Sequence, residues 1–173
     1  INPNFGFIKH QISGDGSRIL MRSRNLIAVP QPDNDIEFVL VEDDGNAADN
    51  TTYGAVSYKY NISKYAIRET DIDAYNADPA NDGALQITLT ESGDDKPATN
   101  VSWNQAARYV NWLNIKDGAQ PAYKFDTGGA NDPISLWDSA DAWQVDGENR
   151  YRHKDARYFL PSEDEWYKAA YYK

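Results

Sequence analysis

The pattern of apolar and polar positions is clearest at the C-terminal end of the chain. Residues 158–160 form a short β-prone run, and Pro161 should end it because proline lacks a backbone N–H and fixes φ. Ser162 and Glu165 have the spacing of a capping box, which predicts the start of a helix. The face expected to be buried follows helical spacing and comprises Trp166, Ala169, Ala170 and Lys173.

A second helix is predicted over residues 102–114 by the same two signals. Ser102 and Gln105 form another capping box. The apolar stripe behind this cap comprises Trp103, Ala106, Ala107, Val110 and Leu113. Because both helices combine a cap with an apolar stripe, we expect them to pack in one core.

Short strands and long polar connections make up the rest of the predicted domain. Strands are expected at 36–41, 54–67 (with Val56, Tyr58 and Tyr60 on one face), 85–89, 122–125 and 134–137, and a short helix at 70–76. Short strands, few helices and many loops together indicate an α+β fold.

Residues 1–35 are predicted to be an N-terminal arm or hairpin ahead of a domain at 36–173. Two β-prone runs, 18–22 and 25–29, are separated by polar residues. The arm is also the most basic part of the chain, so it could contact a partner chain. The alternative is that these are solvated charges on a strand edge.

Composition narrows the classes of function. The 173 residues fit one domain and carry a net charge of −10, which would repel a nucleic-acid backbone. We therefore expect no nucleic-acid partner, and no apolar stretch is long enough for a membrane span. The chain has no cysteine, so it has no disulfide and no thiol nucleophile, and cysteine usage does not indicate a compartment.

Aromatic residues make up 13% of this polar chain, either as a compact core of amphipathic rings or as a ring-lined surface for sugars or peptides. Trp103, Trp112 and Trp166 lie in helical patterns, so the core interpretation is preferred for them. Residues 117–155 are rich in Gly, Asp and Asn, and a loop of this length often carries function. The candidate ligand-contacting rings of this region are Trp137, Trp143 and Tyr123.

No metal motif is predicted. The acids of residues 42–50 raise the possibility of calcium, but their spacing does not match the EF-hand loop, and Asp, Asn and Gly clusters are commonly plain turns. His10 and His153 are far apart and are expected to face solvent, with His153 in a basic run that disfavours a cation. Apart from possible calcium, no cofactor and no catalytic residue is identified.

Three segments resemble a known family. Residues 159–170, Phe-Leu-Pro-Ser-Glu-Asp-Glu-Trp-Tyr-Lys-Ala-Ala, look like the R-L-P-T-E-A-E-W-E-x-A-A signature of the formylglycine-generating enzyme, or sulfatase-modifying factor, family. Residues 97–114 are similar to its P-V-x-x-V-S-W motif, with Asn111 where many members have cysteine or an aliphatic residue. Residues 54–75 match more loosely. The resemblance covers about residues 36–173 and implies a C-type-lectin-like fold, with two main helices on short, twisted antiparallel strands and long irregular loops.

The resemblance also bears on function. In the enzymes of this family the catalytic cysteines and calcium-binding residues lie beyond this last helix, so no active-site residue can be transferred and the domain is expected to lack its C-terminal part. We predict a non-catalytic, lectin-like surface or structural module, extracellular, on a cell surface or in a virion. Its expected partner is a protein or glycan surface ligand, with oligomers formed through the N-terminal arm and the exposed C-terminal helix. The alternatives are an incomplete chain of a formylglycine-generating oxidase and a purely architectural oligomer subunit.

Overall fold

A computed structural model describes residues 8–9, 36–90, 93–129 and 131–171. The α-helices are α1 (Glu69–Asn76), α2 (Trp103–Lys116) and α3 (Glu163–Tyr171), and two 3₁₀ turns follow α1 at Pro79–Asn81 and Gly83–Leu85. The strands are β1 (Ile8–Lys9), β2 (Phe38–Val41), β3 (Tyr60–Ser63), β4 (Lys124–Phe125), β5 (Ile134–Ser135), β6 (Ala142–Trp143), β7 (Asn149–His153) and β8 (Tyr158–Phe159). This composition confirms the predicted α+β class.

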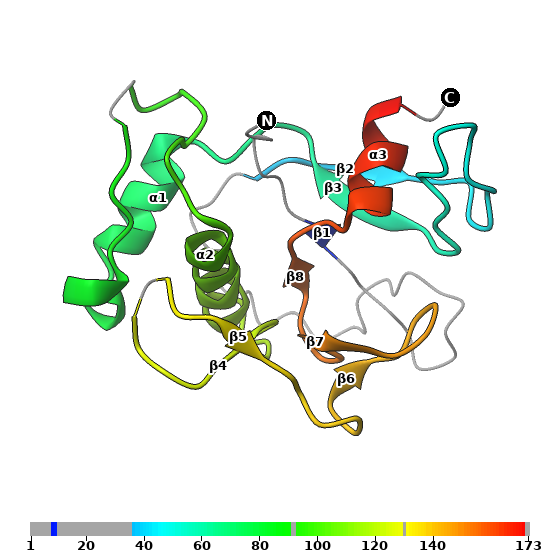
Figure 1. Ribbon diagram of the computed structural model, residues 1–173. Helices are drawn as coiled ribbons and strands as arrows, with labels where there is room; N and C mark the ends of the chain where they lie inside the picture. The colour runs from blue at the N-terminus through cyan, green and yellow to red at the C-terminus, as the bar shows by residue number, and fades with distance from the viewer. Residues whose placement is uncertain (1–7, 10–35, 91–92, 130, 172–173) are drawn as a thin grey trace, which may run out of the picture.

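The strands form three small antiparallel sheets. A four-stranded sheet has the order β2-β3-β1-β8, and the hairpins β4–β5 and β6–β7 form two further sheets. Figure 1 shows α2 between α1 and β8, with α3 beside β2 and β3 at the other end of the molecule. The two predicted helices therefore pack on different parts of the fold.

One part of the predicted N-terminal arm belongs to the main sheet. The backbone of β1 lies between β3 and β8, with Ile8 opposite both Ile62 and Phe159. The β-prone runs 18–22 and 25–29, and His10, lie outside the described residues. The contact of this arm with a partner chain stays a prediction.

The core gathers around α2 as its stripe predicts, with one exception. Ala106, Ala107, Val110 and Leu113 are buried, whereas Trp103 is 50% exposed. Buried rings from α1, α2 and β8 complete this core: Tyr75, Tyr109 and Phe159. The core prediction for Trp103 was therefore wrong, because the first helical position lies at the rim of the core, where its ring packs edge-on against Tyr123 at 5.2 Å.

Two asparagine side chains of α2 form hydrogen bonds with backbone groups of neighbouring segments. The Asn111 side chain donates to the Tyr123 carbonyl at 2.7 Å and accepts from the Tyr123 N–H at 2.9 Å. Asn114, which is fully buried, does the same for Tyr158, donating to its carbonyl and accepting from its N–H, both at 3.0 Å. A buried backbone group needs a partner, so these amides hold β8 and the start of the β4 segment against the helix.

The predicted strand at 85–89 is not formed. Leu85 ends a 3₁₀ turn, and the chain beyond it is extended but without a partner strand in the described residues. The Asn76 side chain donates to the Ile87 carbonyl at 2.9 Å and accepts from the Ile87 N–H at 2.8 Å. The Ile87 side chain is buried in the core. Its backbone hydrogen bonds are made with the Asn76 amide instead of with a neighbouring strand.

Helix α3 buries a different face from the one predicted, with Ala169 as the residue common to both. Its capping box is confirmed: the Ser162 N–H donates to Glu165 at 2.6 Å, and the Glu165 N–H donates to the Ser162 hydroxyl at 3.2 Å. However, Glu165 and Lys168 are buried, whereas Trp166 is 37% exposed. The helix packs on the β2–β3 connection, whose backbone carbonyls and tyrosine hydroxyls need polar partners, so its buried face is polar.

Candidate functional site

A buried ion pair joins β7 to α3. The guanidinium of Arg152 donates two hydrogen bonds to the Glu165 carboxylate, at 2.9 and 2.7 Å, and a third to the Leu160 carbonyl at 2.7 Å. Both side chains are almost inaccessible to solvent. Two parallel bonds of this kind fix orientation as well as distance, so the start of α3 is held against the β7 strand.

The Glu165 carboxylate has no acceptor capacity left. One oxygen accepts from Arg152 and from the Tyr58 hydroxyl, and the other accepts from Arg152 and from the Ser162 N–H. An ionised carboxylate has about four acceptor positions. All of them are used, so Glu165 is a structural anchor and is not available as a general base.

The ionisation states follow from these contacts. Burial raises the pKa of Glu165, but the hydrogen bonds and charge of Arg152 outweigh that effect and hold its pKa below the usual range. Burial lowers the pKa of Arg152, but its hydrogen bonds to the Glu165 carboxylate and the charge of that carboxylate outweigh burial and raise the pKa. Burial and the Glu165 charge both raise the pKa of Tyr58. The pair is therefore charged, and Tyr58 is neutral.

Two further tyrosines complete the buried network. The Tyr60 hydroxyl donates to the Glu165 backbone carbonyl, and the Tyr123 hydroxyl accepts from the Leu160 N–H at 2.8 Å. β3 and the β4 segment are thereby linked to the strand end and the helix start around the ion pair. The region is fixed by side chains from four separate elements.

A hollow of about 540 Å³ opens beside this network. Its lining includes Tyr58 and Arg152 from the network, and the rings and polar groups of Trp143, Tyr151, Asp146, Glu148 and Asn149. Tyr151 is 54% exposed. The hollow thus combines an accessible ring with carboxylate and amide groups, on a floor that is held rigidly.

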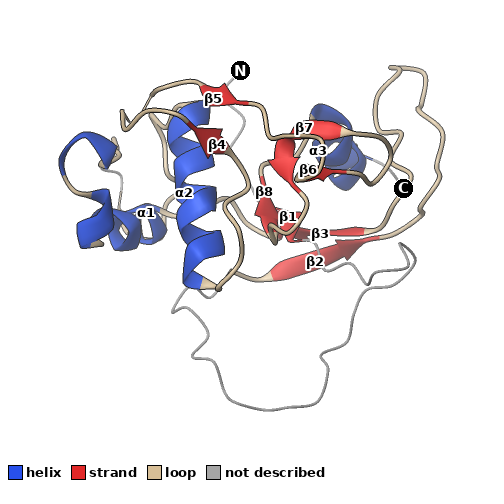
Figure 2. Ribbon diagram, turned by 90° about the horizontal axis from the view of Figure 1, so that it is seen from below, coloured by secondary structure: helices blue, strands red, loops and turns tan. Residues whose placement is uncertain are grey.

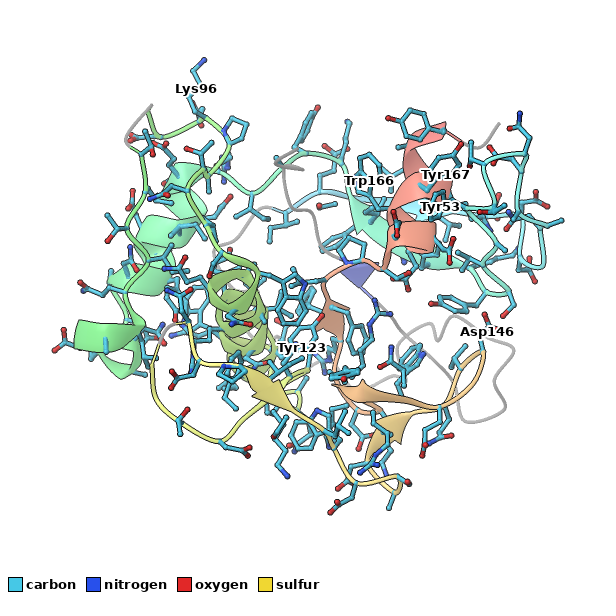
Figure 3. The ribbon with its side chains drawn as sticks, in the orientation of Figure 1. Tyr53, Lys96, Tyr123, Asp146, Trp166 and Tyr167 are labelled. Atoms are coloured by element: carbon cyan, nitrogen blue, oxygen red, sulfur yellow. The ribbon has the colours of Figure 1, made fainter. Side chains whose placement is uncertain are left out.

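The rim of the hollow is the β6–β7 turn. Asp146 and Gly147 both have positive φ, 60° and 102°, which is the backbone geometry of a tight hairpin turn of the Asp-Gly type. Figure 3 shows Asp146 at the tip of this turn. A glycine is needed at 147 because the left-handed region is unfavourable for side chains, so the turn presents its carboxylates in a defined position.

The three rings singled out from the sequence lie in two different environments. Tyr123 and Trp143 are each 3% exposed, and Trp143 packs edge-on against Phe159 at 5.1 Å. Trp137 is half-buried, donates from its indole N–H to the Ala122 carbonyl at 2.9 Å, and packs against the His153 ring. Of the three, only Trp143 lines the hollow, and the burial of Tyr123 and Trp143 favours the core interpretation for them.

The exposed fractions of His153 and Trp166 contradict two other expectations from the sequence. His153 is 6% exposed and is not solvent-facing, because β7 places its ring against Trp137. Trp166 was expected in the core and is accessible on the outer face of α3. Trp112 is half-buried, with its indole N–H donating to Asp78 at 2.8 Å, as an amphipathic ring at the core boundary does.

Sequence reasoning missed Arg152, Tyr58 and Tyr151 as members of this region. Arg152 appeared only as part of a basic run, and Glu165 only as a capping residue. The sequence carried little signal, because the burial of Arg152 and His153 beside the exposed Tyr151 depends on the irregular pairing of β7 with β6. An arginine on the inner side of such a strand needs a carboxylate partner.

The acidic segment 42–50 is organised by its own hydrogen bonds. The Asn46 side chain donates to the Gly54 carbonyl at 2.6 Å, and Asp49 accepts from Thr51 and from the Tyr167 hydroxyl. Within the described ranges, no group of three or more His, Cys, Asp or Glu side chains is placed to hold a metal ion. Calcium binding stays an untested prediction.

Comparison with known proteins identifies the domain. The family model for the "Sulfatase-modifying factor enzyme 1-like domain" matches residues 41–171, which is the greater part of the 173-residue chain. No curated protein and no solved structure matches the chain significantly. Among the helices that the structure describes, none is both long and apolar enough to cross a membrane.

Proposed function

The chain belongs to the sulfatase-modifying factor family, and from that premise we propose that it is a non-catalytic, lectin-like binding module. Its ligand is a glycan or protein surface, and the binding site is the hollow beside the β6–β7 turn. We infer that the helices and small sheets follow the C-type-lectin-like arrangement that the sequence motifs imply. In that arrangement, irregular loops on a fixed scaffold carry the specificity.

The hollow is the observation that carries this proposal. Its lining residues include the exposed Tyr151 together with Asp146, Glu148 and Asn149. An aromatic face packs against the apolar side of a sugar or a peptide side chain. Carboxylate and amide groups accept from and donate to hydroxyls, so the combination fits a polar ligand with one apolar face.

The non-catalytic part of the proposal is supported by how the ionisable groups are used. The buried carboxylate of Glu165 and the buried guanidinium of Arg152 satisfy each other and nearby backbone groups. The chain contains no cysteine, so it has no thiol of its own for the oxidation of a sulfatase cysteine. A binding role uses the same fixed floor without requiring either group to react.

The setting of such a module is also proposed. Extracellular, cell-surface and virion locations suit a domain that presents loops to external ligands. Assembly into oligomers through the N-terminal arm and α3 suits a structural component. The exposed rings of α3 are the feature that favours this assembly.

A glycan array probed with the fluorescently labelled 173-residue chain tests the proposal. Glycans that bind are then titrated by calorimetry against the wild type and three variants. Tyr151→Ala and Asn149→Ala should each weaken binding by about tenfold or more, because each removes a contact from the hollow. Tyr65→Ala is the matched control, since Tyr65 is another exposed ring, 65% accessible, that does not line the hollow.

Other outcomes identify the alternatives. An array with no hits, together with a stable homo-oligomer by light scattering, would support the architectural subunit and reject the binder. Conversion of a peptide cysteine to formylglycine by the product of the full gene, carrying paired cysteines beyond these residues, would support the oxidase. Binding that survives both hollow variants would place the ligand elsewhere.

A further inference from the structure

The β6–β7 hairpin contributes a run of consecutive residues to the lining of the hollow. Residues 150–152 of β7 lie between the pairing partners of Ala142 and Trp143, which are neighbours in β6. Consecutive side chains do not alternate strictly where a strand bulges in this way, and residues 148–152 all line the hollow. Figures 1 and 2 show this hairpin on the side of the molecule away from α1.

Two residues of this run carry hydrogen-bond donors without a partner. The Arg150 Nε donates to the Trp137 carbonyl at 2.8 Å, and the Asn149 Oδ1 accepts from the Tyr151 N–H at 3.0 Å. Among the residues that the structure describes, the terminal nitrogens of Arg150 and the Asn149 Nδ2 have no further partner. None of these nitrogens is buried, so all are accessible to a ligand while their side chains are held in place.

The guanidinium of Arg150 is suited to a carboxylate. Its neighbour Arg152 is already paired with Glu165 and the Leu160 carbonyl, so it offers no free charge to a ligand. A guanidinium with two free terminal nitrogens holds a carboxylate through two parallel hydrogen bonds. The free N–H groups of Asn149 add a further donor to the same lining.

The β6–β7 turn adds two carboxylates to this hollow. Asp146 and Glu148 both line it and are exposed. Within the described ranges, neither side chain has a hydrogen-bond or ion-pair partner, and neither pairs with Arg150. The hollow therefore presents separated, unpaired charges of both signs.

A ligand that carries both charges fits this arrangement better than a ligand that carries one. A purely cationic group would be repelled by Arg150, and a purely anionic group would be repelled by Asp146 and Glu148. The net charge of −10 on the chain further opposes an anion. A zwitterion avoids both penalties, because its carboxylate can lie at Arg150 and its ammonium group at the turn.

A sugar carries these two groups at a lower entropic cost than a protein surface does. A pyranose ring holds its substituents in fixed positions, whereas lysine and glutamate side chains lose rotamer freedom when they bind. The ring of Tyr151, which is 54% exposed and belongs to the same lining, supplies a face for the apolar side of a sugar.

We propose that the hollow binds a zwitterionic sugar, which carries a carboxylate and a primary ammonium group on one ring. Arg150 and the Asn149 amide hold the carboxylate, and Asp146 and Glu148 hold the ammonium group. This inference rests on the proposed function, because it specifies the ligand of that same binding site.

Four methyl pyranosides with the same ring test the proposal. They are the glucoside, which is neutral, the glucuronide with a carboxylate, the glucosaminide with an ammonium group, and the glucosaminuronide with both. Each is titrated by NMR into the isotope-labelled 173-residue chain. The glucosaminuronide should bind about tenfold more tightly than each of the other three, and it should shift the side-chain resonances of Asn149 and Arg150.

Variants assign each charge of the ligand to its place in the hollow. Arg150→Gln should weaken the glucuronide and the glucosaminuronide about tenfold without weakening the glucosaminide. Asn149→Asp keeps the acceptor for its backbone hydrogen bond and repels a carboxylate, so it gives the same result should Arg150→Gln not fold. The double variant Asp146→Asn with Glu148→Gln should instead weaken the two ligands that carry an ammonium group.

A matched control removes a charge elsewhere. Lys96 is exposed, and Figure 3 shows it at the end of the molecule away from Asp146. Lys96→Gln should therefore bind all four pyranosides as the wild type does. The double variant keeps a good turn sequence, because Asn-Gly suits the same hairpin turn as Asp-Gly.

Three results would overturn the proposal. Tightest binding of the glucosaminide, unchanged by Arg150→Gln, would make the hollow a cation site. A blocked lysyl-glutamyl peptide that binds as tightly as the glucosaminuronide would make the ligand a protein surface. Equal binding of all four pyranosides, weakened by Tyr151→Ala, would reject charge selection and leave the proposed glycan site standing. If no pyranoside binds and the glycan array gives no hits, the proposed function fails as well.

Discussion

Arg152 and Glu165 form a bidentate, fully buried ion pair between strand β7 and helix α3, with bonds of 2.9 and 2.7 Å. The pair lies thirteen positions apart in sequence, across the β8 strand and the helix cap. Removing one partner leaves the other charged in a dry environment, which costs more than the pair itself contributes. The relationship therefore controls both stability and the floor of the proposed binding site.

Loss of one partner of the ion pair should destabilise the protein more than replacement of both partners by apolar residues. Glu165→Leu should lower the free energy of unfolding by about 3–5 kcal/mol, because Arg152 remains buried and uncompensated. The double variant Arg152→Met with Glu165→Leu should lose less than the sum of the two single changes. Urea denaturation of all four proteins gives the coupling, and strictly additive losses would contradict this account.

The two asparagines of α2 should be sensitive to truncation. Asn114→Ala removes the partners of the Tyr158 N–H and carbonyl, and each buried group left unpaired costs about 1–3 kcal/mol. Thermal unfolding should show a large loss. Asn104→Ala is the matched control, since Asn104 is on the same helix but only half-buried, with a hydrogen bond to the Asn131 carbonyl in place of buried strand backbone, and it should cost less than about 1 kcal/mol.

Alanine variants of Gly54 and Gly45 distinguish the cost of backbone strain from the cost of a side-chain clash. Both have positive φ, 88° and 82°, but a Cβ at 54 would lie 3.0 Å from the Tyr167 ring, while nothing lies within 4 Å at 45. Gly45→Ala should cost about 1–2 kcal/mol from the left-handed backbone alone. Gly54→Ala should cost about 1 kcal/mol more. Equal losses in urea denaturation would mean that Tyr167 moves aside freely.

Because Tyr58 and Tyr60 have raised pKa values, the unfolding free energy of the protein is expected to fall at alkaline pH. Burial, followed by the Glu165 charge, raises the pKa of Tyr58 and Tyr60 above the ordinary value. The unfolded chain therefore releases these protons first, and stability falls as the pH rises above about 10. Unfolding free energies measured across this range should decline, and Tyr58→Phe should reduce the slope. An unchanged slope would contradict the assignment.

Truncation of Trp143 should cost much more stability than truncation of Trp166. Trp143 is 3% exposed and Trp166 is 37% exposed. Trp143→Ala should cost about 3–5 kcal/mol, since it leaves a cavity against Phe159. Trp166→Ala should cost less than about 1 kcal/mol. Denaturant midpoints compare them directly, and a large loss for Trp166 would restore the core role that its helical spacing predicted.

Local chemistry by itself determined where the main helices begin and which class of fold they belong to. The two capping boxes, Ser102 with Gln105 and Ser162 with Glu165, are each visible as two residues three positions apart, and both form as predicted. The buried stripe of α2 was also recoverable, because its neighbours are apolar side chains. The family model matches residues 41–171, a range that contains both of these segments.

Only the tertiary structure decided which face of α3 is buried and which side chains meet at the candidate site. Helical spacing indicated that Trp166 is buried, but α3 packs on a connection whose backbone carbonyls accept hydrogen bonds from its side chains. Lys168 donates to the Asp43 carbonyl at 2.7 Å, and Glu165 pairs with Arg152. Hydrophobic periodicity predicts the buried face of a helix only where its neighbour is apolar. It does not predict the buried face of α3, because α3 packs on polar backbone groups and pairs with the charge of Arg152 from another strand.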